Sequence, residues 1–280
     1  MIYRLGDDPS SYATAKDLAV DVLLFDLEDS VSPADKAPAR KRMGAAFAAG
    51  NFNGQERLIR INGLDTPFGA DDLAFAAKAP IDGIMIAKAE TGRQMRDVCD
   101  SLGGRGAPAS LRLWAMIETP KGILNAAEIA TATPRMEAIA IGLGDLSRGM
   151  GGFRKAAPYR FPMLTALSTV VMVAKAHGLS AIDSSFRDAR DPEGFRAACL
   201  ESRELGYDGK AVGSQAFAKI ADECFGPTKA EIDWSKRVLA AVAAAPKGIQ
   251  VAVDGQLIEP GYLDVAHQIA EMATWPRLAA

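Results

Sequence analysis

The sequence contains few of the residues that build disulfide frameworks and zinc centres. Its 280 residues include two histidines and three cysteines, and no two of the cysteines form a CxxC pair. These counts exclude a disulfide scaffold, a thiol redox pair and a cysteine-rich or histidine-rich zinc site. Neither His177 nor His267 directly follows a strand-like run, so we do not expect a histidine general base.

An excess of charge of one sign and a long apolar run are also missing. Lysine and arginine number 32 against 35 acidic residues, giving a net charge of −3. Such a balance offers no basic footprint for nucleic acid or for an anionic membrane. No window reaches the roughly 18 apolar residues of a membrane span, and the opening "MIYRLGDDPSS" is unlike a signal peptide. We therefore expect a soluble, cytoplasmic protein whose partners are small molecules or proteins.

Short apolar runs alternate with alanine-rich segments of helical spacing. The strand-like runs are Ile2–Leu5, Val22–Phe25, Leu58–Ile61, Gly83–Ala87, Leu111–Ile117, Ala138–Ile141, Leu179–Ile182 and a weaker Gly209–Val212. The helix-like segments are Tyr12–Ala19, Ala34–Ala49, Asp71–Ala79, Gly92–Leu102, Lys121–Ala130, Met163–Ala176 and Pro192–Leu205. The runs rarely alternate polar with apolar residues, which is typical of parallel strands covered on both faces.

This repeated alternation predicts an α/β fold, a (β/α)8 or TIM barrel, over residues 1–225. An open doubly wound sheet is the main rival, but no GxGxxG follows the first strand. Residues 226–280 differ in texture and predict a long helix at Lys229–Ala245, a hairpin turning at Asp254-Gly255 and a closing helix. We expect this segment to be a small C-terminal lid or a subunit contact.

Charged residues end most of the predicted strands. These strand-end residues are Asp26, Glu28 and Asp29, then Arg60, Lys88, Glu118, Asp145 and Asp183. The carboxyl ends of barrel strands converge on one mouth, where barrel enzymes have their active sites. The pattern therefore predicts that these charged residues form a functional site and are not scattered over the surface.

The residue types at these strand ends indicate a hard metal ion and an acid substrate. Glu118 and Asp145 follow neighbouring strands, so their carboxylates are candidate ligands of one Mg²⁺. Arg60 is the candidate for binding a substrate carboxylate, because its planar fork fits one. Gly144, in "GLGD", would offer an unhindered backbone N–H, and Lys88 is a further candidate for substrate binding. A metal, a cation and such donors stabilise a developing oxyanion.

Several blocks also resemble the citrate lyase beta-subunit-like family of the HpcH/HpaI aldolase superfamily, which includes malyl-CoA and citramalyl-CoA lyases. They are "DVLLFDLEDSVSPADKAPAR", "IRINGLDTPFGADDL", "GIMIAKAE", "AMIETPKGILNAAEIA", "AIGLGDLSRGMG", "AIDSSFRDARDPEGF" and "CLESRELGYDGK", in that order. The resemblance spans nearly the whole chain. It implies a TIM barrel, a homotrimer or hexamer, Mg²⁺ on Glu118 and Asp145, and substrate binding by Arg60.

The resemblance also implies an acidic residue from the lid of an adjacent subunit. That block reads "GQLIEP" here, with Glu259 in place of an aspartate. Glu259 and Asp29 are the candidate catalytic acids. A second departure lies after "GYDGK", where Gly213, Ser214 and Gln215 replace the family's Ile-His-Pro near the acyl-CoA site.

These observations predict an Mg²⁺-dependent carbon–carbon lyase acting on a β-hydroxyacyl-CoA such as malyl-CoA or citramalyl-CoA. Three alternatives stay open: a metal-dependent aldolase acting on a free 2-oxo or hydroxy acid without CoA, a non-catalytic citrate lyase-like subunit, and a phosphate-binding barrel enzyme using "GYDGKAVGSQ".

Overall fold

The computed structural model divides into two compact units, Met1–Ala221 and Asp222–Ala280, which are described separately. It describes residues 1–6, 8–50, 52, 54–151, 160–246 and 250–275.

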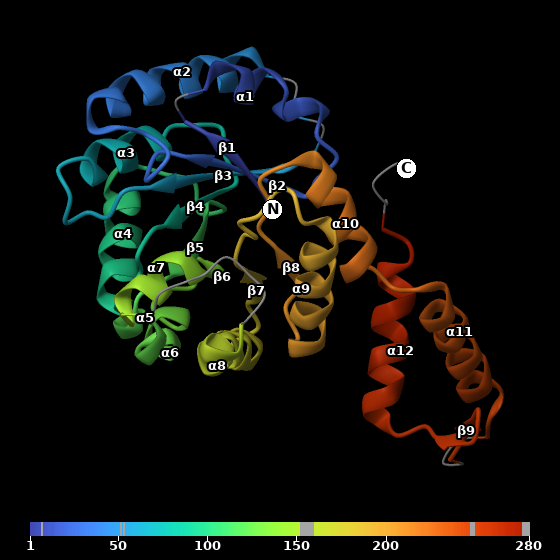
Figure 1. Cartoon of the computed structure of the whole chain (residues 1–280). Helices are drawn as coiled ribbons and strands as arrows, with labels where there is room; N and C mark the ends of the chain where they lie inside the picture. The colour runs from blue at the N-terminus through green and yellow to red at the C-terminus, as the bar shows by residue number, and fades with distance from the viewer. Residues whose placement is uncertain (7, 51, 53, 152–159, 247–249, 276–280) are drawn as a thin grey trace. The chain divides into compact units, whose positions relative to one another are not determined.

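The first unit is built on one curled sheet of eight parallel strands in sequence order (Figure 1). The strands are β1 Ile2–Leu5, β2 Val22–Asp26, β3 Glu56–Ile61, β4 Gly83–Ile86, β5 Arg112–Ile117, β6 Met136–Ile141, β7 Ser180–Asp183 and β8 Gly209–Lys210. A parallel bridge pairs Ile2 with Val212, just beyond β8, and the Tyr3 N–H donates to the Val212 carbonyl at 3.1 Å. The predicted α/β fold of the TIM-barrel type is thus confirmed in its strand order and in the curl of its sheet.

Helices connect the strands and lie on the outer side of the sheet (Figure 1). They are α1 Pro9–Ala13, η1 Ala15–Asp17, η2 Pro33–Asp35, α2 Lys36–Ala49, α3 Gly69–Ala76, α4 Gly92–Gly104, α5 Pro120–Leu124, α6 Ala126–Ala130, α7 Leu143–Gly149, η3 Phe161–Met163, α8 Leu164–Ala176, α9 Pro192–Leu205 and α10 Gln215–Phe225. The boundary between the two units falls within α10.

The helices differ from the prediction in several places, and α10 was not predicted. The segment expected as one helix from Lys121 to Ala130 is two short helices, because Asn125 leaves the helical backbone and donates from its amide to the Glu90 carbonyl at 2.8 Å. The expected helix at Tyr12–Ala19 similarly divides into α1 and η1 at Thr14. Helix α7 was not among the predicted helical segments, and Asp145 lies in its first turn.

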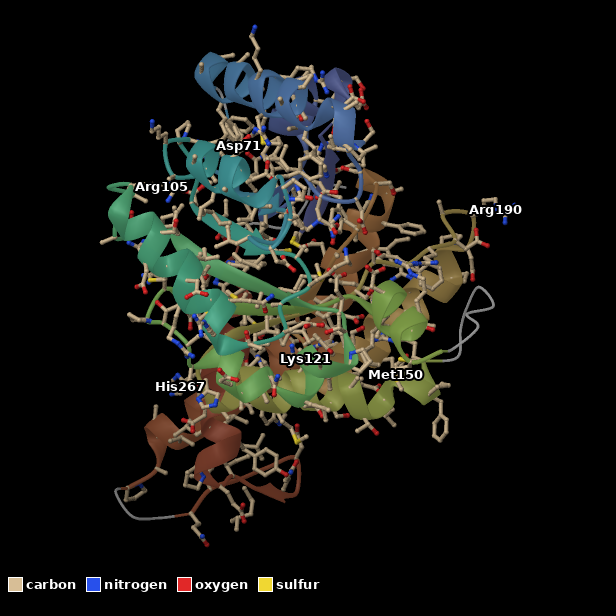
Figure 2. All side chains as sticks on the ribbon, turned by 90° about the vertical axis from the view of Figure 1, so that its left-hand side faces the viewer. Asp71, Arg105, Lys121, Met150, Arg190 and His267 are labelled. Carbon is tan, nitrogen blue, oxygen red and sulfur yellow. The ribbon has the colours of Figure 1, made fainter. Side chains whose placement is uncertain are left out.

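The outer surface carries charged side chains, among them Asp71 on α3 and Arg105 at the end of α4 (Figure 2). Within the described residues, every helix is too short or too polar to cross a lipid bilayer.

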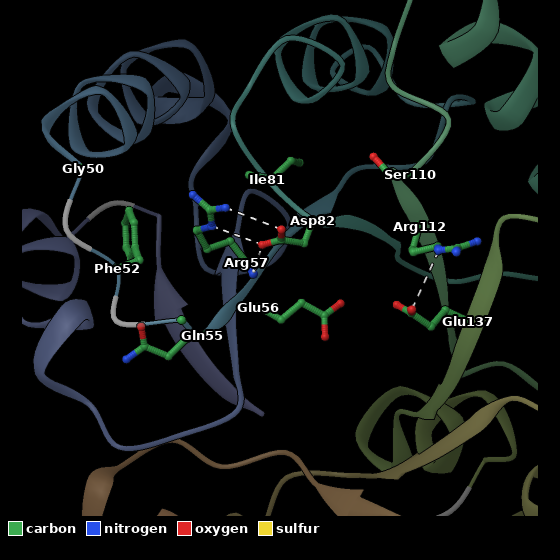
Figure 3. A pocket seen from close by; sticks show the side chains of 11 residues that line it. Gly50, Phe52, Gln55, Glu56, Arg57, Ile81, Asp82, Ser110, Arg112 and Glu137 are labelled. Carbon is green, nitrogen blue, oxygen red and sulfur yellow. Dashed lines mark hydrogen bonds and ion pairs between the residues drawn. The ribbon is translucent and has the colours of Figure 1, made fainter. Parts of the chain in front are cut away.

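A cavity of about 660 Å³ opens at the starts of strands β3 to β6 (Figure 3). Glu56 opens β3 and Arg112 opens β5, and both line this cavity with Glu137 of β6. Trp114 donates from its indole N–H to Glu137 at 2.9 Å, which holds that carboxylate near the strand starts.

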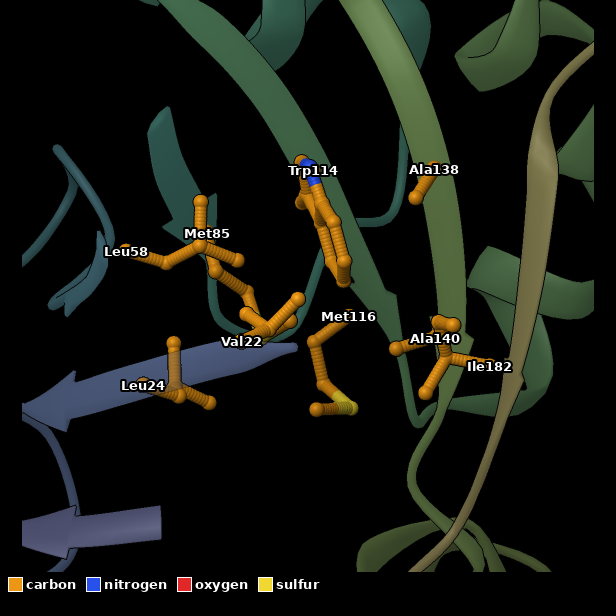
Figure 4. Close-up of a cluster of buried hydrophobic side chains, with 9 residues drawn as sticks. All are labelled: Val22, Leu24, Leu58, Met85, Trp114, Met116, Ala138, Ala140 and Ile182. Atoms are coloured by element: carbon orange, nitrogen blue, oxygen red, sulfur yellow. The ribbon is translucent and has the colours of Figure 1, made fainter. Parts of the chain in front are cut away.

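The interior of the sheet is filled by apolar side chains that recur at every second position (Figure 4). This cluster comprises Val22, Leu24, Leu58, Met85, Trp114, Met116, Ala138, Ala140 and Ile182. Because side chains on a strand alternate between faces, the residue two positions further on points to the same interior. Leu24 is therefore followed by Asp26, Leu58 by Arg60, and Met116 by Glu118.

The second unit contains α11 Lys229–Ala244, a hairpin of β9 Ala252–Val253 and β10 Gln256–Leu257, and α12 Pro260–Met272. The predicted turn is present, with positive φ at Asp254 (52°) and Gly255 (80°), as a two-residue hairpin of type I′ requires. Its buried core consists of Val238, Val253 and Ala266, with partly buried residues around them.

Glu56 provides a test of the strand-start cavity through pH. Burial, with repulsion from Glu137, raises the pKa of Glu56 to about 7 from 4.5. The folded state then binds more protons than the unfolded chain between these values. The contribution of Glu56 to the free energy of unfolding is therefore fully present below about pH 4.5 and is lost as the pH rises toward 7. We expect Glu56→Gln to unfold at higher urea than the parent at pH 8, with a smaller difference at pH 5. Glu204→Gln, an exposed change on α9, is the control, and a difference independent of pH would contradict the expectation.

Candidate active site at the carboxyl ends of the strands

A pocket of about 380 Å³ opens at the other end of the sheet, where the strands finish. It is lined by Tyr3, Leu5, Asp26, Asp29, Ser30, Arg60, Met116, Glu118, Ile141, Gly142, Gly144, Asp145, Ser184, Ser185, Arg187 and Ala211. The interior alternation carries Asp26, Arg60 and Glu118 to this pocket, directly above the apolar cluster. The same alternation of side chains along the strands therefore produces both the apolar cluster inside the sheet and the charged pocket at the strand ends.

Arg60 is held in the pocket by a buried bidentate ion pair. Its Nε and Nη2 donate to the two carboxylate oxygens of Asp26, each at 2.7 Å. Burial alone would raise the pKa of Asp26, but Arg60 and its hydrogen bonds keep that pKa below the usual value. The guanidinium also lies over the Tyr3 ring at 5.2 Å. Its Nη2 also lies 3.4 Å from a carboxylate oxygen of Glu28, and its Nη1 makes no hydrogen bond to any described residue.

Glu118 is a buried carboxylate at the end of β5. The backbone N–H of Lys88 donates to its Oε1 at 3.0 Å. Burial raises the pKa of Glu118 to about 7, and the negative charge of Asp145 adds to the rise. A side chain at Gly142 would overlap Glu118, so the glycine leaves the space that this carboxylate occupies. The Glu118 carboxylate therefore occupies the space left by Gly142, and it lies close enough to Asp145 to feel its negative charge.

Lys88 links the acids of the pocket. Its ammonium contacts Glu28 and lies 3.5 Å from Asp29 and 3.4 Å from Asp145. Burial opposes its charge, but these carboxylates outweigh burial and raise its pKa. Its backbone has φ +50°, a left-handed conformation that costs a non-glycine residue about 1–2 kcal/mol. Surrounding contacts can hold a residue in such a strained conformation. Here these contacts are the hydrogen bond from the Lys88 N–H to Glu118 and the ion pairs of the Lys88 ammonium.

Asp145 lies in the first turn of α7, which begins after the Gly142 N-cap. Besides Lys88, it contacts Arg148, one turn further along the same helix. Its side chain is only 18% exposed. Both oxygens therefore have cationic neighbours, whose positive charge opposes the binding of any other cation at Asp145.

The structure brings most of the predicted site residues together. Glu118, Asp145, Arg60, Asp29 and Gly144 line the one pocket, and Lys88 contacts two of these acids. Glu259 belongs to the second unit, where it is the exposed N-cap residue of α12 and its side chain makes no capping hydrogen bond. Its catalytic role stays a prediction.

Asp183, at the end of β7, does not reach the pocket. Its carboxylate contacts Lys210, accepts from Arg160 at 2.8 Å and accepts from Ser202 at 2.6 Å. Asp183 is fully buried, and its carboxylate oxygens are paired with these residues inside the fold. Asp183 therefore anchors the loop that follows β7.

Sequence reasoning missed Tyr3, Lys36 and Arg187. Tyr3 belongs to the first apolar run, and its alternation with Leu5 was the available signal. Lys36 opens α2 and donates from its ammonium to the carbonyls of Leu27 and Glu28, each at 2.7 Å, which fixes the turn after β2. No sequence signal distinguishes Lys36 from an ordinary helix lysine.

The donor set of the pocket fits Mg²⁺. Two carboxylates with a free cavity between the ends of adjacent strands suit a hard ion that keeps water and substrate oxygens in its octahedron. Among the described residues no group of three or more histidine, cysteine, aspartate or glutamate side chains gathers as a ready metal site. A two-carboxylate site of this kind needs a ligand to complete it.

Fold and pocket together define an α/β protein of the TIM-barrel type with an acid-lined pocket at the carboxyl ends of its strands, where such proteins carry out catalysis. The chain belongs to the HpcH/HpaI aldolase/citrate lyase family, whose model matches residues 1–214. This is a family of enzymes.

Relatives and solved structures match nearly the full length. The chain is 35% identical to a (3S)-malyl-CoA thioesterase from Cereibacter sphaeroides, over 96% of this chain and 92% of the relative. It is 32% identical to the citrate lyase subunit beta of Leuconostoc mesenteroides subsp. cremoris, over 98% and 92%. The CitE protein of Mycobacterium tuberculosis, solved with magnesium, acetoacetate and coenzyme A, superposes with a TM-score of 0.82 at 27% identity, covering 97% of this chain and 96% of that one.

The position of Lys88 predicts a competition with Mg²⁺. Replacing Lys88 by methionine removes a positive charge beside Asp145, so we expect Mg²⁺ to bind on the order of tenfold more tightly in calorimetric titration. Lys121→Met is the control, because Lys121 is 61% exposed and pairs with Glu90 (Figure 2). Equal or weaker Mg²⁺ binding by Lys88→Met would show that this ammonium does not oppose the ion.

Proposed function

We propose that this protein is an Mg²⁺-dependent carbon–carbon lyase that cleaves a β-hydroxyacyl-CoA such as malyl-CoA or citramalyl-CoA. The observation that carries the proposal is the convergence of Glu118, Asp145 and Arg60 on one pocket. It is supported by the full-length similarity to the citrate lyase beta subunits and to a CitE protein solved with magnesium and coenzyme A.

The residues of the pocket divide the work of binding. Glu118 and Asp145 would hold Mg²⁺, which when bound supplies Lewis-acid polarisation of substrate oxygens. Arg60 directs Nη1 toward the substrate carboxylate, because Asp26 occupies the opposite edge of the guanidinium. The Gly144 N–H and the Lys88 ammonium are further donors to the anionic substrate.

Cleavage requires a proton to leave the β-hydroxyl and another to reach the carbon released as the thioester enolate. Asp29 is our candidate base in the pocket, because its side chain is 62% exposed and the Lys88 and Glu28 contacts help to lower its pKa despite partial burial. Glu259 is our candidate acid, supplied by the C-terminal lid of an adjacent subunit. We further propose a closed (β/α)8 barrel, a homotrimer or hexamer and a cytoplasmic location.

A second candidate is hydrolysis of the thioester of malyl-CoA. The similarity to (3S)-malyl-CoA thioesterases at 35% identity favours it, and the same pocket would bind the same substrate. A third is cleavage of a free hydroxy acid, which the sequence Gly213-Ser214-Gln215 favours because the family has Ile-His-Pro there.

Removal of either carboxylate tests the metal site. We expect Glu118→Gln and Asp145→Asn each to weaken Mg²⁺ binding by more than about 100-fold in calorimetric titration, since loss of even the partners of metal ligands costs about 10- to 100-fold. Glu128→Gln and Asp97→Asn, half-exposed carboxylates on α6 and α4, are matched controls that should bind Mg²⁺ like the parent. Parent-like binding by both site variants would remove the basis of the proposal.

Product analysis separates the three candidate reactions. Incubation with malyl-CoA and Mg²⁺ should release acetyl-CoA and glyoxylate if the protein is the proposed lyase. Malate and free CoA would instead identify a thioesterase, and turnover of free hydroxy acids alone would identify an aldolase. Arg60→Lys should lower turnover by at least about tenfold, because lysine cannot reproduce the planar fork.

A further inference from the structure

The pocket contains a second arginine that has no partner among the residues that the structure describes. Arg187 lies in the loop after β7 and lines the pocket with Arg60. The Nε and Nη2 of Arg60 are paired with Asp26 along one edge of the guanidinium. The guanidinium of Arg187, in contrast, makes no hydrogen bond or ion pair with any residue in the described part of the chain. Its neighbour Asp188 pairs with Arg190 instead, at 3.1 Å.

The loop that carries Arg187 is anchored on its amino-terminal side. The Ser184 hydroxyl accepts from the Leu143 N–H at 3.2 Å, and the Ser184 N–H donates to Asp183 at 2.7 Å. Phe186 packs edge-on against Phe195 and Phe217, with ring centroids 5.7 and 6.2 Å away. The backbone beside Arg187 is therefore held while its side chain extends over the pocket.

Gly144 makes room for this guanidinium. A Cβ at position 144 would lie 2.5 Å from Nη2 of Arg187, so the missing side chain allows the arginine to lie against the backbone of α7. Asp145, a candidate metal ligand, is the next residue. Arg187 thus reaches the same small volume as the metal site and the free edge of Arg60.

Arg187 is exposed, so its unpaired guanidinium at the pocket is open to an anionic ligand. Its planar donors fit a carboxylate or a phosphate. Arg60 and the metal already account for one substrate carboxylate in the proposed function. Arg187 is left with a different group.

We propose that Arg187 is a specificity-determining residue that binds a second oxygen anion of the ligand, separate from the carboxylate held at Arg60. The inference rests on the proposed function for the position of the first carboxylate. The second anion has two possible sources. In a CoA thioester such as malyl-CoA, which has a single free carboxylate, it is a phosphate of CoA, and in the free-acid candidate reaction it is the distal carboxylate of a dicarboxylic acid.

Calorimetric titrations with matched ligands test this proposal. L-malate and L-lactate are both 2-hydroxy acids, and malate carries one additional carboxylate. CoA and pantetheine differ in the phosphates. Each ligand is titrated with and without Mg²⁺ into the parent, Arg187→Gln, Arg187→Lys and the control Arg190→Gln. Arg190 is on the same loop, is 90% exposed, and lies outside the pocket lining (Figure 2).

The parent and Arg190→Gln should bind malate about 10- to 100-fold more tightly than lactate, the gain typical of a charge-assisted contact. Arg187→Gln should lose this preference, and Arg187→Lys should keep part of it. Loss of only the preference for CoA over pantetheine would support the proposal with a phosphate as the anion. If Arg187→Gln keeps both preferences, the proposal is overturned.

The design separates this proposal from the proposed function. If Glu118→Gln still binds Mg²⁺ like the parent, the metal site fails, whereas the malate preference measured without Mg²⁺ still reports on Arg187. If the metal site holds and Arg187→Gln discriminates as the parent does, only the present inference fails.

Discussion

The buried ion pair of Asp26 with Arg60 is the contact on which the pocket depends. Asp26 holds the guanidinium from one side and also accepts the backbone N–H groups of Glu28, at 2.9 Å, and Ser30, at 3.2 Å. It thereby shapes the turn after β2 and places Glu28 where it meets Lys88. A buried charge left without its partner is strongly unfavourable, so the two strands must keep this register for either residue to be tolerated.

The pocket is lined by more acidic than basic side chains around a small volume. Lys88 compensates Glu28, Asp29 and Asp145, while Glu118 lies buried and accepts the backbone N–H of Lys88. Burial, with the negative charge of Asp145, raises the pKa of Glu118 to about 7 although Arg60 and Lys88 lie near. A divalent cation would favour the charged form of these carboxylates, and magnesium is the ion in the structure of the related CitE protein.

Local patterns in the sequence predicted the order of the strands and several of the residues of the pocket. The order of apolar runs predicted all eight strands, because the strands are short and most are buried on both faces. The strand-end positions of Arg60, Glu118 and Asp145 predicted their convergence, because parallel strands end at one edge. The split between α5 and α6 escaped prediction, since it depends on the amide of Asn125 reaching Glu90, 35 residues away.

The sequence by itself determined which side chains stand at the ends of the strands and what ligand chemistry they offer. Only the tertiary structure decided their partners. Asp26 meets Arg60 across 34 residues and Lys88 meets Glu28 across 60, and no local pattern encodes such pairs. The same holds for Asp183, which Lys210 and Arg160 neutralise inside the fold, and for Arg187, which is left unpaired among the described residues at the pocket. Charge pairing depends on distance in space, and only the curl of the sheet sets that distance.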